Sequence, residues 1–250
     1  MDPLITNSPG IFIIFEATIL VTNKSKLFMN YRILAFTLLL SSLFGCEKFA
    51  GESITVTFDI VNTYKELHVS NAINVVISDT VEEVKVTAGE NLIPNIIIEE
   101  KGDKLDIRLK DGVYFFNSAV NIELPANSGL TKLYLSDASD IEGKVNTEEL
   151  TINLTDASDA KLNGHVGKLI LNLKDASAIK KNIINKCYGL SCDECEVSME
   201  DASDVYIHCD GTIRIVKLSD ACDLHYTGNA EIILTSGVPS SSSDIKHDVL

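Results

Sequence analysis

The second half of the chain alternates between apolar and polar positions, and the alternation stops each time at a similar acidic corner. Two and four residues before the first aspartate of each corner the side chain is apolar, while the residue between them is mostly polar. Alternation with a period of two is typical of a half-buried strand. The positions predicted to face a core are Leu133, Leu135, Ile152, Leu154, Leu171, Leu173, Val197, Met199, Val216 and Leu218.

The corners recur at an almost constant interval. Their first aspartates are Asp137, Asp156, Asp175, Asp201 and Asp220, at spacings of 19, 19, 26 and 19 residues. A second strand is expected after each corner, because an apolar residue stands four positions beyond each aspartate: Ile141, Ala160, Ile179, Val205 and Leu224. Units of this kind cannot enclose a core alone and must stack. The sequence therefore predicts an all-β fold, a parallel β-helix (β-solenoid) with rungs of about 19 residues.

Each corner is predicted to be a tight turn. An alanine follows the aspartate in every copy (Ala138, Ala157, Ala176, Ala202 and Ala221), and we expect that only a small side chain fits inside the bend. The neighbouring aspartate and serine side chains can hydrogen-bond to the local backbone.

The preceding segment also has the pattern of short strands. Residues 54–79, 81–112 and 120–125 alternate, with interruptions at glycines and a proline. We expect this part to supply irregular rungs and one capped end of a single domain that spans residues 54–250.

An export signal is expected ahead of this domain. Arg32 is followed by an apolar run at 33–40 and then by Leu43-Phe44-Gly45-Cys46, which has the order of a secretory signal peptide and resembles the lipobox of bacterial lipoproteins. That resemblance implies a lipid on Cys46. The alternative, a membrane-spanning anchor, would need about 20 apolar residues.

These features divide the chain into four parts. We expect residues 1–28 to be an extension upstream of the true start at Met29, residues 29–45 to be the signal peptide, and residues 46–53 to be a short tether. The predicted location is the cell envelope, lipid-anchored to the outer membrane, on its periplasmic or its outer face.

Charge narrows the range of partners. The chain has 36 acidic and 21 basic residues, a net charge of −15. Nucleic acids are bound through clusters of Lys and Arg, so no nucleic-acid partner is expected. The expected partners are the membrane, through the lipid, and a glycan or a surface protein; the oligomeric state stays open.

Residues 54–250 as a set resemble the auto-transporter adhesin, head GIN domain family of bacterial envelope proteins. The resemblance lies in SNAINVVIS (70–78), in residues 84–109, in the serial corners and in LHYTGNAEI (224–232). It implies a β-helical fold and an envelope location. Two features depart from the family pattern: Ala72-Ile73-Asn74 replaces Gly-Ile-Asn, and an aspartate replaces the usual glycine of each corner.

The aspartates are candidate contacts for a cation or a partner. A stacked column of Asp137, Asp156, Asp175, Asp201 and Asp220 would repel itself, as would the aspartates three residues further on, Asp140, Asp159, Asp204 and Asp223. Bound calcium could offset this repulsion. The simpler interpretation is turn capping with solvated charges, because the glycine-rich loops of calcium-binding repeats are missing, and no cofactor is otherwise expected.

The cysteines beyond Cys46 are candidates for disulfides. Cys187, Cys192 and Cys195 lie where the repeat swells by seven residues, and Cys209 and Cys222 follow. Zinc would require a matching second pair of ligands that the spacing does not offer. Disulfides suit an oxidising envelope, and the odd number leaves one thiol free or paired between chains.

No catalytic constellation is evident, and the histidines form no column in the repeat. The chain is therefore interpreted as a binding protein rather than an enzyme, an adhesin for a glycan or protein ligand. Two alternatives remain, a structural or envelope-maintenance protein without an external ligand and, less favoured, a polysaccharide-acting enzyme.

Overall fold

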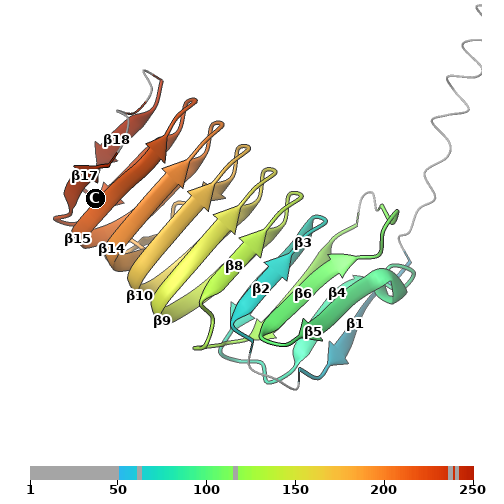
Figure 1. Cartoon of the computed structure of the whole chain (residues 1–250). Helices are drawn as coiled ribbons and strands as arrows, with labels where there is room; N and C mark the ends of the chain where they lie inside the picture. Colours follow the sequence, from blue (N-terminus) through green and yellow to red (C-terminus); the bar gives the residue numbers. More distant parts are fainter. Residues whose placement is uncertain (1–50, 61–63, 115–117, 236–238, 240–241) are drawn as a thin grey trace, which may run out of the picture. The chain divides into compact units, whose positions relative to one another are not determined.

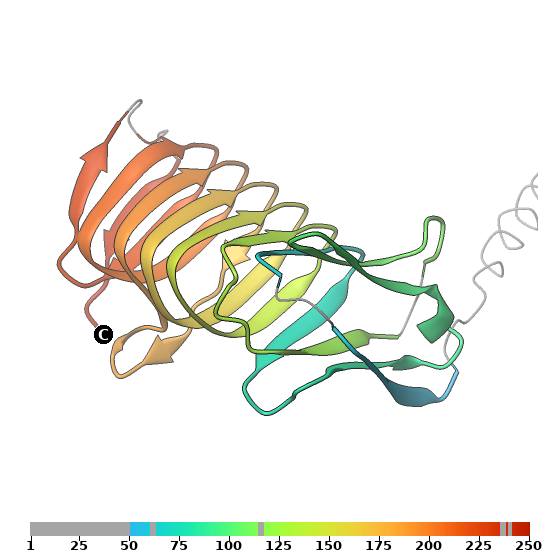
Figure 2. The ribbon, with the colours of Figure 1, turned by 60° about the horizontal axis from the view of Figure 1, so that its bottom comes forward.

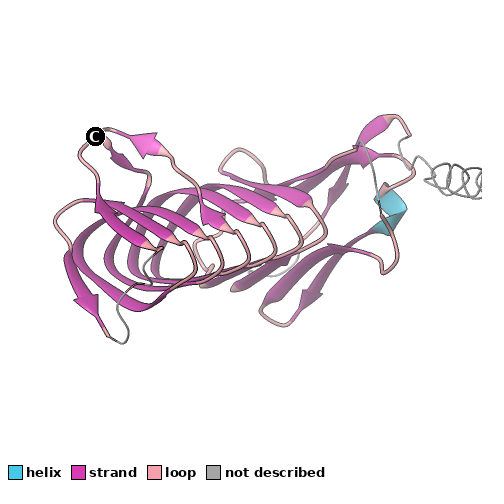
Figure 3. Cartoon of the chain, turned by 90° about the horizontal axis from the view of Figure 1, so that it is seen from above, coloured by secondary structure: helices cyan, strands magenta, loops and turns pink. Residues whose placement is uncertain are grey.

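The computed structural model describes residues 51–60, 64–114, 118–235, 239 and 242–250, and residues 48–250 form one compact unit. The described part is all-β, with one single-turn 3-10 helix at Ile93–Asn95 (Figure 3). No helix in these ranges is long and apolar enough to cross a membrane. The expected signal peptide and the expected lipidation site, Cys46, lie outside the described residues.

Eighteen strands follow one another along the described chain. The first nine are β1 (Ser53–Phe58), β2 (Glu66–Val69), β3 (Ile73–Ser78), β4 (Val84–Gly89), β5 (Ile96–Lys101), β6 (Lys104–Leu109), β7 (Val120–Pro125), β8 (Lys132–Leu135) and β9 (Asp140–Leu154). The second nine are β10 (Asp159–Leu173), β11 (Ala178–Ile179), β12 (Ile183–Ile184), β13 (Cys187–Tyr188), β14 (Leu190–Met199), β15 (Asp204–Leu218), β16 (Asp223–Thr227), β17 (Glu231–Leu234) and β18 (Asp244–His247).

The repeats form stacked coils whose strands pair in parallel (Figure 1). Every paired residue of β9 lies opposite the residue 19 positions later in β10, from Asp140↔Asp159 to Leu154↔Leu173. The 26-residue spacing is accommodated in the same way, because Gly164 of β10 pairs with Leu190 of β14. Each coil therefore hydrogen-bonds to the coils on either side of it through most of its length.

The predicted inner columns are buried, with one exception. All five residues two positions before the aspartates and all five residues four positions after them are buried. Val216 is only half-buried, because a register shift between Val197 and Ser198 places Ile215 opposite Val197. Ile215 is 1% exposed and takes the core position that the sequence pattern assigned to Val216.

The corners differ from the expectation in which residue faces inward. The aspartate and the alanine of each corner both have positive φ, between 54° and 63°. This left-handed pair turns both side chains outward, so the alanines are exposed and the next residue is fully buried: Ser139, Ser158, Ser177, Ser203 and Cys222. The inner residue of the bend is therefore the serine or cysteine, and the expectation that alanine lies inside is wrong.

Hydrogen bonds between coils fix these corners. The N–H of each alanine from Ala138 to Ala202 donates to the carbonyl of the aspartate in the next corner at 2.8 Å, and Ala72 makes the same bond to Asp137. The buried serines add to the ladder where the hydroxyl of Ser158 accepts from the N–H of Ser139. The left-handed conformation costs about 1–2 kcal/mol for a residue other than glycine, and these bonds offset that cost.

The N-terminal strands join the same stack out of sequence order. β2 lies between β6 and β8, and β3 lies between β7 and β9, all in parallel. β1, β4 and β5 then add antiparallel pairs at the N-terminal end of the stack. The sheet is therefore mixed, and this end is closed by antiparallel strands (Figure 1).

The seven additional residues of the long repeat form a separate hairpin. β12 and β13 pair only with each other, joined by Asn185 and Lys186, which both have positive φ. Figure 2 shows this hairpin projecting from the side of the coils, near the C-terminus.

Gly164 should be indispensable to the stacking of coils. Its φ is 107°, and a Cβ added there would lie 2.0 Å from the carbonyl oxygen of Val145 in the preceding coil. We expect Gly164→Ala to lower the free energy of unfolding by about 3 kcal/mol, since backbone strain and steric overlap add. Urea denaturation of residues 48–250 measures this loss.

Gly102→Ala is the matched control. Gly102 also has positive φ, 61°, but no atom would lie within 4 Å of an added Cβ. This variant should lose only about 1 kcal/mol, so equal losses in the two variants would contradict the role assigned to the contact between coils.

Candidate functional site

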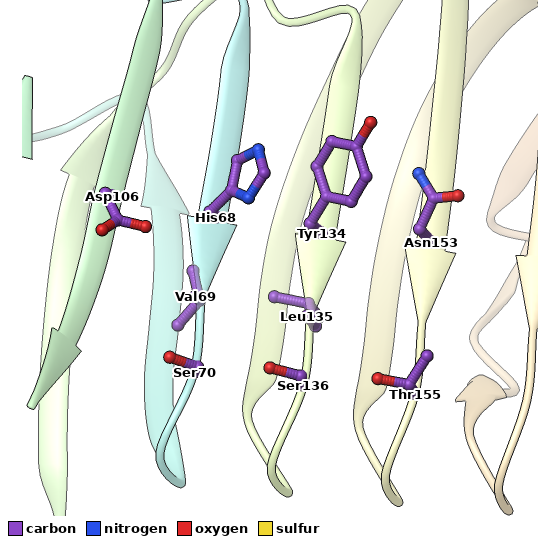
Figure 4. A pocket seen from close by; sticks show the side chains of 9 residues that line it. All are labelled: His68, Val69, Ser70, Asp106, Tyr134, Leu135, Ser136, Asn153 and Thr155. Carbon is purple, nitrogen blue, oxygen red and sulfur yellow. The ribbon is translucent and has the colours of Figure 1, made fainter. Parts of the chain in front are cut away.

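A row of polar side chains crosses the outer surface of the N-terminal coils. Asp106 of β6 lies opposite His68 of β2, His68 opposite Tyr134 of β8, and Tyr134 opposite Asn153 of β9. We call these four residues the outer ladder. Figure 4 shows them side by side on successive strands, with Val69 and Leu135 below them.

The outer ladder lines a shallow pocket of about 290 Å³, together with Val69, Ser70, Leu135, Ser136 and Thr155. The rings of His68 and Tyr134 stack at a centroid distance of 4.1 Å and an interplanar angle of 22°. Stacking of this kind holds both rings upright on the sheet, so their edges form the pocket wall. The hydroxyls of Ser70, Ser136 and Thr155 form a second polar row beside it (Figure 4).

Two polar atoms in the ladder lack a hydrogen-bond partner. These are Asn153 Nδ2 and His68 Nε2, both shielded from bulk solvent. Asn153 Oδ1 is already occupied, because it accepts from Asn172 Nδ2 at 3.0 Å, and His68 Nε2 lies 3.6 Å from Glu66 Oε2, beyond hydrogen-bonding distance. A buried polar group without a partner costs free energy, and a rotation of either side chain would bring its unpaired atom to a hydroxyl of a ligand in the pocket.

The electrostatics of the pocket are set by its rim. Burial, followed by the charge of Lys104, lowers the pKa of His68, which keeps its ring neutral near pH 7. A hydrogen bond from Lys132 at 2.7 Å lowers the pKa of Glu66. Asp106 contacts Lys104 at 3.3 Å and Arg108 at 3.1 Å. The pocket therefore offers a neutral donor–acceptor set beside a carboxylate whose charge is balanced.

The corner aspartates lie elsewhere. Asp137, Asp156, Asp175, Asp201 and Asp220 are exposed and occupy the outer edge of the stacked corners. Within the ranges that the structure covers, no group of three or more His, Cys, Asp or Glu side chains is close enough to hold a metal ion. In two corners the preceding hydroxyl donates to the aspartate, from Thr155 to Asp156 Oδ2 at 2.7 Å and from Ser136 to Asp137 Oδ2 at 3.2 Å.

The second row of aspartates is partly neutralised by lysines of later coils. Lys180 contacts Asp159 at 2.9 Å and Lys246 contacts Asp223 at 3.3 Å. Burial, followed by the charge of the aspartate in the next coil, raises the pKa of Asp140 and of Asp204. The stacked carboxylates of this row therefore repel one another, and the lysine side chains offset that repulsion.

The outer ladder is not predicted by the sequence pattern. Tyr134, Asn153 and Asn172 stand between buried positions, and alternation predicts only that they face outward. Their column could have been extended through the repeat, but His68 and Asp106 belong to coils whose order in space differs from their order in the chain. No spacing rule predicts that His68 lies beside Tyr134, 66 residues away.

Four of the five described cysteines are buried, and all five are free thiols in the structure. Cys192 and Cys209 are register partners on adjacent parallel strands. Hydrogen bonding with Cys195 raises the pKa of the Cys192 thiol, and hydrogen bonding with Cys192 raises that of Cys209. The three thiols are therefore neighbours in the core.

We expect an oxidising compartment to join Cys192 to Cys209. Paired Cα atoms on adjacent strands lie about 4.8 Å apart, within the range of about 4.4–6.8 Å that a disulfide spans. A disulfide oxidoreductase would accept the two electrons and the two thiol protons. Peptide mapping under non-reducing conditions should recover the two cysteines in one linked pair, about 2 Da lighter than the separate peptides.

A Cys222→Ser variant is the control for this pairing. It should leave the linked pair unchanged, because Cys222 is the buried residue of the last corner and its thiol donates to the carbonyl of Ser219. Five free thiols in denatured protein exported to an oxidising compartment would contradict the pairing.

Comparison with known proteins gives the same architecture. The model of the family described as "putative auto-transporter adhesin, head GIN domain" matches residues 63–182 and again 117–230. Among the curated proteins, none matches the chain.

Two crystal structures share the fold. A "putative adhesin" from Bacteroides fragilis has a TM-score of 0.56 at 16% identity, and 81% of this chain aligns with 100% of that one. A "putative adhesin" from Parabacteroides merdae has a TM-score of 0.50 at 13% identity, with the same coverage. The two family matches together span most of the described coils, and the chain belongs to the auto-transporter adhesin, head GIN domain family.

Proposed function

We propose that this protein is a cell-envelope lipoprotein whose ectodomain binds a glycan outside the membrane that anchors it. Membership in a family described as adhesins supports an association with the envelope or cell surface. The lipid would be attached at Cys46. This role requires no catalytic residues. Binding is the function that the geometry of the outer ladder supports best.

We infer that the ectodomain is a parallel β-helix closed at its N-terminal end. The constant 19-residue offset between β9 and β10 and the repeated left-handed corners support this description. A stack of this kind presents long flat faces on which side chains repeat at the strand spacing of about 4.8 Å. Such a face suits an extended polymer better than a small enclosed ligand.

The unpaired polar atoms of the outer ladder carry the proposal. Asn153 Nδ2 can donate to a hydroxyl, and His68 Nε2 can either donate or accept according to its tautomer. Asp106 and the hydroxyls of Ser136 and Thr155 add acceptors on either side of the aromatic pair. A sugar ring displays hydroxyls that both donate and accept, so a glycan can satisfy this set.

The role of the pocket can be tested on a glycan array with purified residues 48–250. We expect saturable binding to one glycan class, and Tyr134→Ala and Asn153→Ala should each weaken it about tenfold or more, as loss of a central contact does. The array is read with and without calcium, which shows whether the corner aspartates contribute.

Tyr114→Ala is the matched control, because Tyr114 is 82% exposed and does not line the pocket. It should bind like the unchanged protein. The absence of binding to any glycan by a folded sample would reject the proposal in favour of an envelope-maintenance role.

The lipid anchor is tested separately in cells that make the full chain. We expect metabolic labelling with a fatty acid to mark the protein, and Cys46→Ala to abolish the label and release the protein from the membrane fraction. Protease treatment of intact cells then shows which membrane face carries the ectodomain. A Cys222→Ser protein controls for the loss of a cysteine as such and should keep the label.

A further inference from the structure

The hairpin that interrupts the repeat has a composition unlike the rest of the chain. Residues 180–186 read KKNIINK and contain three lysines and no acidic residue, in a protein with a net charge of −15. We call residues 180–189 the basic hairpin. Its strands, β12 and β13, form a two-stranded sheet apart from the main one.

The tip of the basic hairpin exposes apolar surface. Ile183 is 51% exposed and Ile184 is 43% exposed. Consecutive residues of a strand point to opposite faces, so the hairpin presents an isoleucine on each side. Lys186 lies in the turn between the strands and is also exposed.

The base of the basic hairpin is firmly held. Tyr188 is 2% exposed, its N–H donates to Thr227 Oγ1 at 3.2 Å, and its hydroxyl donates to Asp248. The ring of Tyr188 meets that of Tyr206 edge-on at 5.4 Å, and Lys181 Nζ lies 5.9 Å and 6.0 Å from the centres of these two rings. A fixed base with an exposed apolar tip is the arrangement of an insertion loop rather than of a loose connection.

We propose that the basic hairpin inserts its tip into a surface of anionic lipid. A protein partner would have to enclose both faces of the hairpin to cover the two isoleucines, whereas lipid surrounds a narrow tip from every side. Lys186 in the turn would remain at the level of the phosphates, as cationic side chains do at membrane interfaces, whereas Lys180 is paired with Asp159. The acidic remainder of the chain is repelled by the same surface, which restricts contact to the basic hairpin, the segment that projects from the side of the coils in Figure 2.

The test uses residues 48–250, which form a compact unit of their own. Flotation with vesicles of phosphatidylglycerol and phosphatidylethanolamine is compared with flotation with vesicles of phosphatidylcholine alone. We expect partition onto the anionic vesicles only, reduced by added salt. The double variant Ile183→Ser/Ile184→Ser and the variant Lys186→Glu should each reduce it about tenfold.

Matched controls change equivalent residues elsewhere on the surface. Val76→Ser alters an exposed apolar residue of β3, 41% exposed, and Lys144→Glu makes the same charge change away from the basic hairpin. Both should partition like the unchanged protein. Because all these positions are exposed, an unchanged melting temperature verifies that each variant is folded.

Fluorescence gives an independent readout, since the chain contains no tryptophan. In an Ile184→Trp variant the emission should shift to the blue on addition of anionic vesicles, while a Tyr114→Trp variant should show no shift. Failure to partition at low salt, or partition that the basic-hairpin variants do not weaken, would overturn the proposal. The proposal would also be overturned if the basic-hairpin variants still bound vesicles but no longer bound glycan, because the hairpin would then contact the glycan rather than the lipid.

Discussion

The hydrogen bonds between successive coils are the constraint on which the rest of the structure depends. At the first four corners the alanine N–H reaches the aspartate carbonyl of the next coil at 2.8 Å, and both residues of the corner adopt a left-handed conformation. Asparagine and aspartate tolerate that conformation better than most residues, which explains the acidic residue at the first position. The alanine tolerates it less well, but its N–H is paired and its side chain is exposed rather than packed against the core.

A regular stack turns every sequence position of the repeat into a column. Inward columns build a continuous core, and outward columns bring like residues together whether or not their charges agree. The second row of aspartates shows the cost, since the pKa of Asp140 and of Asp204 is raised by burial and by the next carboxylate. Lys180 of the basic hairpin and Lys246 of β18 offset this repulsion by pairing with Asp159 and Asp223. The outer ladder arises from the same rule, where unlike residues occupy one column and leave hydrogen-bonding atoms unpaired.

The repeated half of the fold could be predicted from local pattern because its neighbours in space are separated by a fixed number of residues. The inner columns were correct except at Val216, where a one-residue bulge cannot be seen in alternation alone. The orientation of the corner was wrong because a small residue is compatible with either side of a bend, and only the backbone dihedral angles decide between alanine and serine. The outer ladder could not be predicted from the sequence, because β6, β2 and β8 are neighbours in the sheet in an order that differs from their order in the chain.

The two unusual surfaces of the molecule differ in a way that bears on their roles. The outer ladder is polar, locally neutral and built into the flat face of the coils, where an extended ligand can lie across several strands. The basic hairpin is apolar and cationic and stands outside the coils, held by Tyr188 at its base. A strongly acidic protein keeps most of its surface away from anionic membranes and polymers, so the basic hairpin would fix the orientation of the proposed contact with them. The sequence insertion that breaks the repeat therefore adds a feature that the regular stack could not produce.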